Sequence, residues 1–331
     1  MSDWLRRVLF PYMATAVPIY LVATQPVRAE TKLAVAYSLL AVFLVALKDK
    51  ARRPELRPYR RDRPLVLLLT TVGYFLLIMA VRLPIYADVQ QIWEKTPMIV
   101  LVMSSVLLWE RNRPADFGLQ ARDWQRQAGA GLILFAVTWC GVAFGFLIRE
   151  LVFSGIPEVG IGSRLAGALF QLLMFGYGNF AEELFFRGYV QTKLRRAVGA
   201  TAAIALQAIL FALYHVNYRI FPRFDAPGLA LYLWFTFTFG VVMGIIAERT
   251  RGLVAPTIVH VGYNMTWPGS LLYVGYRSAR PFADTLLSAA LPWLAFLLFA
   301  APLSACVLRL FGYRRSGARA GSDETARASA V

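Results

Sequence analysis

Long hydrophobic runs separated by short polar segments make up most of this chain. A helix needs about 20 mostly apolar residues to cross a bilayer, and runs approaching that length recur from end to end. We therefore predict an all-α, polytopic transmembrane helix bundle with about ten spans, eight to ten being compatible with the pattern. The predicted spans lie near residues 8–24, 33–47, 65–81, 97–109, 128–148, 165–185, 199–216, 228–247, 252–271 and 286–308.

Composition supports an integral membrane protein, and the placement of charge predicts its orientation. Hydrophobic residues make up 58% of the chain, charged residues 16%, and the mean hydropathy is +0.54. A net charge of +16 is also found in nucleic-acid-binding proteins. Most Lys and Arg residues, however, fall in alternate loops, which is the positive-inside pattern. We therefore predict cytosolic N- and C-termini, membrane lipids as partners and no nucleic-acid partner.

The basic loops also suggest where the protein resides. The segments assigned to the cytosol are residues 6–7, 48–63, 111–126, 187–196, 249–251 and the tail after residue 308. The polybasic loop 48–63 is expected to touch anionic lipid headgroups. Short loops and an Arg-rich, Lys-poor composition are typical of bacteria, so we predict the bacterial cell (inner) membrane.

The chain divides into three sections of one membrane domain. Residues 1–127 are predicted to hold N-terminal transmembrane helices with basic cytosolic loops. Residues 128–275 contain every candidate site residue, and residues 276–331 hold a final span and a disordered cytosolic tail. The loop 111–119 is a plausible boundary because Pro and Gly punctuate it. The two cysteines, Cys140 and Cys306, lie within predicted helices and offer neither a disulfide framework nor metal-ligand spacing.

An acidic pair in an apolar run is the first candidate site element. Ionisable groups at membrane depth cost roughly 3 kcal/mol each on insertion scales, so they usually face a bundle interior and mark function. Residues four apart share a helix face, so Glu183 and Arg187 can pair. Glu182 points about 100° away and is left available. The alternative is that both carboxylates snorkel at a helix end, but the apolar run continues beyond them.

A histidine lies at a matching depth on the next predicted helix. Glu182 and His215 are separated by 33 residues, and their midpoint falls between Val198 and Gly199, where a turn is expected. An antiparallel hairpin turning there would place both side chains about 24 Å from the turn. A carboxylate beside an imidazole can activate water as a general base. The structural alternative is a buried histidine bonded to a backbone carbonyl.

A second histidine has an asparagine one turn later. His260 and Asn264 share a helix face, and paired neutral donors can stabilise a developing oxyanion. The alternative is that both only form hydrogen bonds between helices. Counting from Gly252, His260 lies only about 12 Å from the cytosolic side, which conflicts with the depth of Glu182. Gly240 and Gly244 form a small-xxx-small face that is expected to let two helices approach closely.

Together these elements resemble the CAAX endopeptidase and bacteriocin-processing (CPBP, Abi) family of intramembrane proteases. The signature of that family matches Glu182-Glu183-Leu-Phe-Phe-Arg187, Phe211-Ala-Leu-Tyr-His215 and His260-Val-Gly-Tyr-Asn264. The resemblance covers about residues 128–275 and implies a glutamate-dependent protease core. By resemblance, Glu182 and His215 would activate water, His260 and Asn264 would form the oxyanion hole, and Glu183 and Arg187 would support the site.

The resemblance implies hydrolysis of a peptide bond in a membrane-associated protein or peptide, without a cofactor. A zinc-dependent mechanism is the less favoured alternative, since Glu182, His215 and His260 are legitimate ligands. A different class of function is a transporter or binding protein that uses the buried Glu, His and Arg as a proton or cation pathway. A transporter does not by itself require a pair of oxyanion donors beside the carboxylate. The family includes members that act on prenylated proteins and members that process other peptides, and the bacterial character makes a prenylated substrate less favoured.

Overall fold

The protein is a helical bundle to which a short β-ribbon is added. The computed structural model describes residues 28–53, 63–85, 91–110, 112–120, 123–153, 156–161, 165–216, 226–265, 272–277, 294, 298 and 301–313. Its helices are α2 (Ala29–Ala51), α3 (Pro64–Ile85), α4 (Gln91–Ser104), α5 (Trp124–Phe153), α6 (Leu165–Glu183), α7 (Thr192–Val198), α8 (Ala200–Tyr214), α9 (Ala226–Thr250), α10 (Val254–Asn264) and α12 (Ala301–Leu310). Two π-helical segments, Ser105–Trp109 and Leu184–Gln191, and a 3₁₀ turn, Pro114–Phe117, complete the helical part. The predicted helical bundle is confirmed.

Several predicted spans have different bounds in the structure. The run at 165–185 does not end there: α6, the π-helical segment Leu184–Gln191 and α7 continue one another to Val198. In the run at 252–271, the structure describes residues 252–265, and 11 of these, Val254–Asn264, form the helix α10. The strand β1 (Ile156–Ile161) pairs antiparallel with β2 (Leu272–Arg277), a feature that the all-α prediction missed. The first predicted span and most of the last lie outside the described residues.

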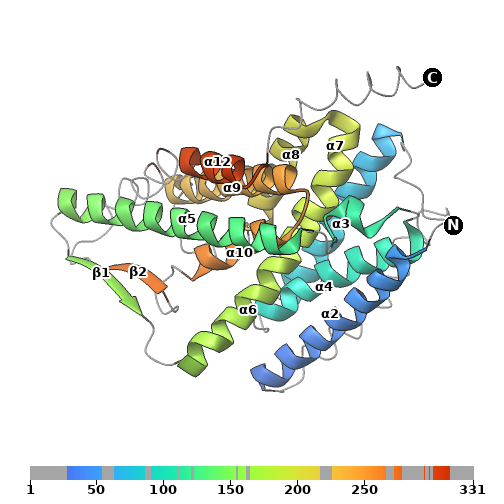
Figure 1. Cartoon of the computed structure of the whole chain (residues 1–331), viewed down its shortest axis with the longest axis horizontal. Helices are drawn as coiled ribbons and strands as arrows, with labels where there is room; N and C mark the ends of the chain where they lie inside the picture. Colours follow the sequence, from blue (N-terminus) through green and yellow to red (C-terminus); the bar gives the residue numbers. More distant parts are fainter. Residues whose placement is uncertain are drawn as a thin grey trace.

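The other helices are arranged around a central helix, which consists of α6, the π-helical segment Leu184–Gln191 and α7. In Figure 1, α6 and α7 run diagonally through the molecule, with α2 and α4 on one side and α5, α10 and α9 on the other. α4 and α10 both pack on α6, α10 also packs on α5, and α8 packs on α9. The largest fully buried side chains include Tyr177, Phe186 and Phe211, so the core lies where these helices meet.

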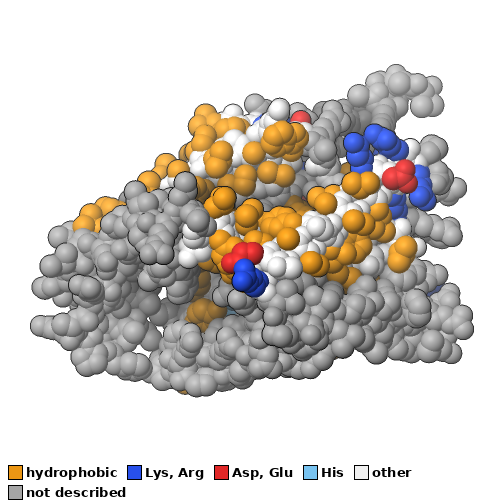
Figure 2. Space-filling view, turned by 90° about the horizontal axis from the view of Figure 1, so that it is seen from below, with side chains coloured by type: hydrophobic (Ala, Val, Ile, Leu, Met, Phe, Trp, Pro, Cys, Tyr) orange, Lys and Arg blue, Asp and Glu red, His pale blue; other side chains and the backbone are white. Residues whose placement is uncertain are grey.

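Exposed apolar surface fits a membrane environment. Figure 2 shows hydrophobic side chains over much of the described part of one face. On α2 the outward side chains Val35, Val42 and Val45 are between 47% and 69% exposed. Within the described residues, α2 and the segment Trp124–Gly145 of α5 are long and apolar enough to cross a bilayer, and several other apolar helices are shorter. The number of spans and the side of the termini stay predictions.

Two close contacts tie the N-terminal helices to the core. The Lys50 ammonium at the end of α2 donates to the carbonyl oxygens of Val106, Leu107 and Glu110. These carbonyls close the π-helical segment after α4, so Lys50 caps that helix end and favours its dipole. The carboxylate of Glu110 in turn pairs with buried Lys193 on α7. The N-terminal helices are therefore held to the core by buried charges, which the sequence analysis did not place there.

Candidate active site

The predicted ion pair of the acidic motif is present and fully buried. Arg187 Nη1 lies 2.9 Å from Glu183 Oε1, and neither side chain is exposed. Arg187 lies in the π-helical segment that follows α6, and such segments often occur at functional sites. Its guanidinium carbon also lies 4.3 Å from the ring centroid of Phe211 on α8. The pair predicted from the four-residue spacing is thus confirmed, and an aromatic ring covers the cation.

Three polar contacts at a constant spacing along the sequence join the central helix to α9. Arg187 reaches the carbonyl of Gly240 at 3.5 Å, and Gln191 donates to the carbonyl of Gly244 at 3.0 Å. One turn further, Arg195 lies 3.3 Å from Glu248. All three contacts join residues that are 53 positions apart, so the two helices run parallel and in register. The two glycines allow close approach on both sides of α9, as the small-xxx-small pattern predicts. A side chain at Gly244 would come within 3.0 Å of Gln191 on the central helix, and one at Gly240 within 3.0 Å of Ala208 on α8.

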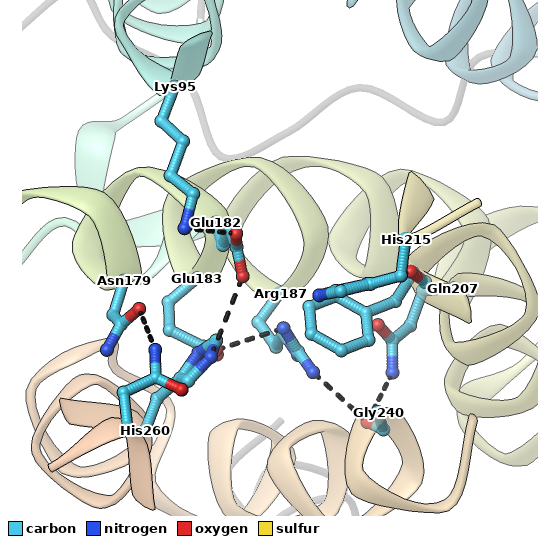
Figure 3. Close-up of polar contacts among 11 residues, drawn as sticks. Lys95, Asn179, Glu182, Glu183, Arg187, Gln207, His215, Gly240 and His260 are labelled. Atoms are coloured by element: carbon cyan, nitrogen blue, oxygen red, sulfur yellow. Dashed lines mark hydrogen bonds and ion pairs between the residues drawn. The ribbon is translucent and has the colours of Figure 1, made fainter. Parts of the chain in front are cut away.

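Glu182 has a partner that the sequence analysis missed. Lys95 Nζ on α4 lies 2.7 Å from Glu182 Oε1, and the Glu182 side chain is 2% exposed (Figure 3). Gly178 makes room for this lysine, because a side chain there would come within 3.1 Å of Lys95 Cδ. The other carboxylate oxygen, Oε2, has no hydrogen-bond partner and lies 3.6 Å from His260 Nε2. One oxygen of Glu182 is therefore anchored, and the other remains available for chemistry.

His260 lies between the two carboxylates. Its Nδ1 is 2.8 Å from Glu183 Oε1, and its Nε2 faces Glu182. A carboxylate only accepts hydrogen bonds, so Nδ1 carries a proton and Glu183 fixes the orientation of the ring. The ring of Phe239 on α9 packs against the imidazole, with centroids 4.9 Å apart. Glu183 is thus shared by Arg187 and His260.

The depth conflict between His260 and Glu182 is resolved by the position of the α9–α10 turn. A side chain at Gly188 would meet Leu253 at 3.2 Å, so the start of α10 lies beside Gly188 rather than at the end of α7. From Gly188 back to Glu182 is six residues, and from Leu253 forward to His260 is seven. The two helices run antiparallel from this level, so both side chains reach the same depth.

His215 enters the site from the predicted hairpin. The turn after α7 is made at Gly199, whose φ of +83° favours glycine, and His215 follows the last residue of α8. Its Nδ1 lies 2.7 Å from the carbonyl oxygen of Phe211. A carbonyl only accepts, so Nδ1 is protonated and the neutral ring has its lone pair on Nε2. The backbone bond of the structural alternative is therefore present, and His215 is also close enough to Glu182 to interact with it electrostatically.

Asn264 meets a second asparagine that the sequence analysis missed. Asn264 Nδ2 donates to Asn179 Oδ1 at 2.8 Å, across the contact between α10 and α6. Asn179 is fully buried, and its own Nδ2 has no hydrogen-bond partner. An unsatisfied buried donor costs ~1–3 kcal/mol. The three-residue spacing from Asn179 to Glu182 places both on one helix face, which is the signal that could have found it.

Two cations offset the two carboxylates of the site. Glu182 and Glu183 carry two negative charges, and Lys95 and Arg187 carry two positive charges. Pairing of this kind is what makes buried charge tolerable. Among the described residues, no group of three or more His, Cys, Asp or Glu side chains is arranged to hold a metal ion.

Comparison with known families agrees with the motifs. Residues 163–266 match the family described as type II CAAX prenyl endopeptidase Rce1-like. The matched segment runs from the start of α6 to just past α10 and includes all six residues predicted for the site. The resemblance to the CAAX protease family is thereby confirmed, and with it the similarity to membrane-embedded hydrolases that cleave peptide bonds. Lys95 lies outside the matched segment. No curated protein matches the chain.

Proposed function

We propose that this protein is an intramembrane endopeptidase that hydrolyses a peptide bond of a membrane-associated protein or peptide. The main support for this proposal is the environment of the Glu182 carboxylate. Its carboxylate is buried in an apolar bundle, one oxygen is anchored by Lys95, and the other has no hydrogen-bond partner. An ionised acceptor held in this way is suited to take a proton from water.

Glu182 is the general base in this mechanism. Water donates a hydrogen bond to Glu182 Oε2, and its oxygen attacks the carbonyl carbon as the proton passes to the carboxylate. The C–O bond forms and the carbonyl becomes a tetrahedral oxyanion. The proton held by Glu182 then moves to the amide nitrogen, the C–N bond breaks, and a free acid and a free amine leave. His215, whose neutral ring has its lone pair on Nε2, assists by accepting a hydrogen bond from the same water.

Asn264 Nδ2 and His260 Nε2, the latter with the imidazole protonated on both nitrogens, provide donors for the oxyanion. Both lie on α10 one turn apart, and both contact the face of α6 that carries Glu182. Preorganised donors of this kind cost no reorganisation when charge develops. Glu183 supports the site by orienting the His260 imidazole, and Arg187 offsets the charge of Glu183. Neither Glu183 nor Arg187 needs to touch the substrate.

The surroundings set the substrate class and location. Exposed apolar side chains on α2 and other helices suit a lipid environment, so the peptide must be anchored in or near the membrane. We place the protein in a cell membrane, with the bacterial inner membrane favoured by composition. The proposed chemistry needs no cofactor, because the base and the donors are all side chains of this chain.

The test compares the wild-type protein with Glu182→Gln in liposomes. Quenched-fluorescent peptides of ten residues would be offered with and without a farnesyl thioether on one cysteine. We expect the wild type to cleave at least one set, and Glu182→Gln to lose ~10²–10⁴ in rate, which is typical for a lost general base. Circular dichroism and melting temperature would show that the variant is folded. Wild-type turnover by Glu182→Gln would refute the assignment, and substrate flux driven by a pH gradient without cleavage would favour a transporter.

A further inference from the structure

An unused hydrogen-bond donor lies one turn from the unused acceptor of the site. Asn179 Nδ2 has no hydrogen-bond partner, and neither does Glu182 Oε2. Both side chains are at most 2% exposed and belong to the same face of α6. Hydrolysis of a peptide bond requires an acceptor for the proton of water and donors for the carbonyl oxygen. The two unsatisfied atoms are thus one donor and one acceptor, which are the two groups that this reaction needs.

The orientation of the Asn179 amide is fixed by its neighbour. Asn264 Nδ2 donates to Asn179 Oδ1 at 2.8 Å, so the oxygen is engaged and the amino group is the end that is left. Figure 3 shows Asn179 and His260 near one another, on the same side of the central helix as Glu183. His260 differs from Asn179 because both of its ring nitrogens face carboxylates: Nδ1 is bonded to Glu183, and Nε2 faces Glu182. Asn179 therefore offers a neutral donor that no other group in the site uses.

We propose that Asn179 is a catalytic residue whose Nδ2 donates to the carbonyl oxygen of the scissile peptide bond and to the oxyanion formed from it. Asn264 then acts both as a donor and as the residue that fixes the Asn179 amide. This inference rests on the proposed peptidase function and adds a residue from α6 to the oxyanion donors of α10. A donor at this position stabilises the transition state to the extent that its hydrogen bond to the oxyanion is stronger than its hydrogen bond to the neutral carbonyl oxygen.

The test uses Asn179→Leu, which removes the donor at nearly constant side-chain size. A peptide cleaved by the wild type in liposomes would serve as substrate. We expect kcat to fall ~10²–10³-fold with KM changed by less than about threefold. The melting temperature should stay close to that of the wild type, because an apolar side chain replaces a group that is only half satisfied. Asn179→Ser, which restores a donor, should recover part of kcat.

Gln191→Met is the matched control. Gln191 is also a buried amide on the same continuous helix, with one hydrogen bond, to Gly244, and an oxygen that has no partner. It lies nine residues, or about 13 Å, beyond Glu182, and its variant should keep kcat within about twofold. If the wild type cleaves and folded Asn179→Leu keeps kcat within threefold, Asn179 is not catalytic. If Asn179→Leu does not fold, Asn179→Ala would be measured instead. A folded Asn179→Ala variant with the kcat of the wild type would equally overturn the proposal. If the wild type cleaves none of the peptides, the peptidase function itself fails.

Discussion

Replacing Arg187 by Met should destabilise the protein strongly by leaving the Glu183 charge buried. The two groups are 2.9 Å apart and neither is exposed. At an effective dielectric constant of 20, the attraction at that distance is about 6 kcal/mol. Removal of one partner of a buried pair costs ~3–5 kcal/mol. His260 Nδ1, 2.8 Å from the same oxygen, can compensate in part, so we expect about 3 kcal/mol.

The expected change can be measured as a melting temperature in detergent. For a chain of 331 residues, 3 kcal/mol corresponds to a fall of about 4 °C. Peptidase activity should fall as well, because Glu183 without Arg187 can shift, and the His260 imidazole that it orients would shift with it. The double variant Glu183→Gln/Arg187→Met removes both charges and keeps a polar partner for His260. It should therefore recover part of the lost stability, which a double-mutant cycle would quantify.

The chain provides an internal control for this experiment. Asp49 and Arg53 form a pair with the same four-residue spacing at 3.3 Å, but their side chains are 72% and 58% exposed. Exposed pairs contribute ~0–1 kcal/mol because water and salt screen them. Arg53→Met should thus shift the melting temperature by no more than about 2 °C. If Arg187→Met melts within the range of Arg53→Met, the buried pair does not stabilise the protein and the reasoning is wrong.

Three further predictions concern donors, packing and metal. Asn264→Ala should lower kcat ~10²–10³-fold with little change in KM, whereas a lower melting temperature with normal kcat would show a purely structural role. Gly240→Leu should cost ~1–3 kcal/mol, since a side chain there meets Ala208 at 3.0 Å. Gly167→Ala is its control, because nothing lies within 4 Å of a side chain at that position. Active enzyme should contain well below one zinc per chain and survive chelation, and stoichiometric zinc with rescue by metal after chelation would contradict this.

Local geometry made part of the site predictable from sequence. The four-residue spacing of Glu183 and Arg187 places them on one helix face whatever surrounds the helix, and the pair is present. The turn at Gly199 followed from the midpoint between Glu182 and His215, and the left-handed backbone there requires glycine. These predictions succeeded because each depends only on helix geometry and on the chemistry of a few neighbouring residues.

Long-range contacts were not predictable in the same way. Lys95 meets Glu182 across 87 positions, and nothing in the periodicity of either segment shows which helices become neighbours. The level of the α9–α10 turn, set by the contact of Leu253 with Gly188, was misjudged because a turn was assumed to lie at the membrane surface. Asn179 was overlooked although its three-residue spacing places it on the same helix face as Glu182, because its hydrogen bond to Asn264 joins two helices and cannot be inferred from that spacing. The pairing of β1 with β2 joins segments more than 100 residues apart, and neither shows strict alternation.

The position of Lys95 on α4 limits how this fold can be divided. The segment that matches the peptidase family begins at residue 163 and would, if produced alone, carry Glu182 without its ammonium partner. That fragment would also lack Glu110, the partner of Lys193. Glu182 and Lys193 would thus each lose an ion-pair partner, and grafting the fragment into another membrane protein would transfer the motif without these partners. The spacing of the motif alone does not define the unit: the motif residues and the N-terminal helices form one structural unit, in which substitutions at Lys95 and Glu182 are coupled through their ion pair.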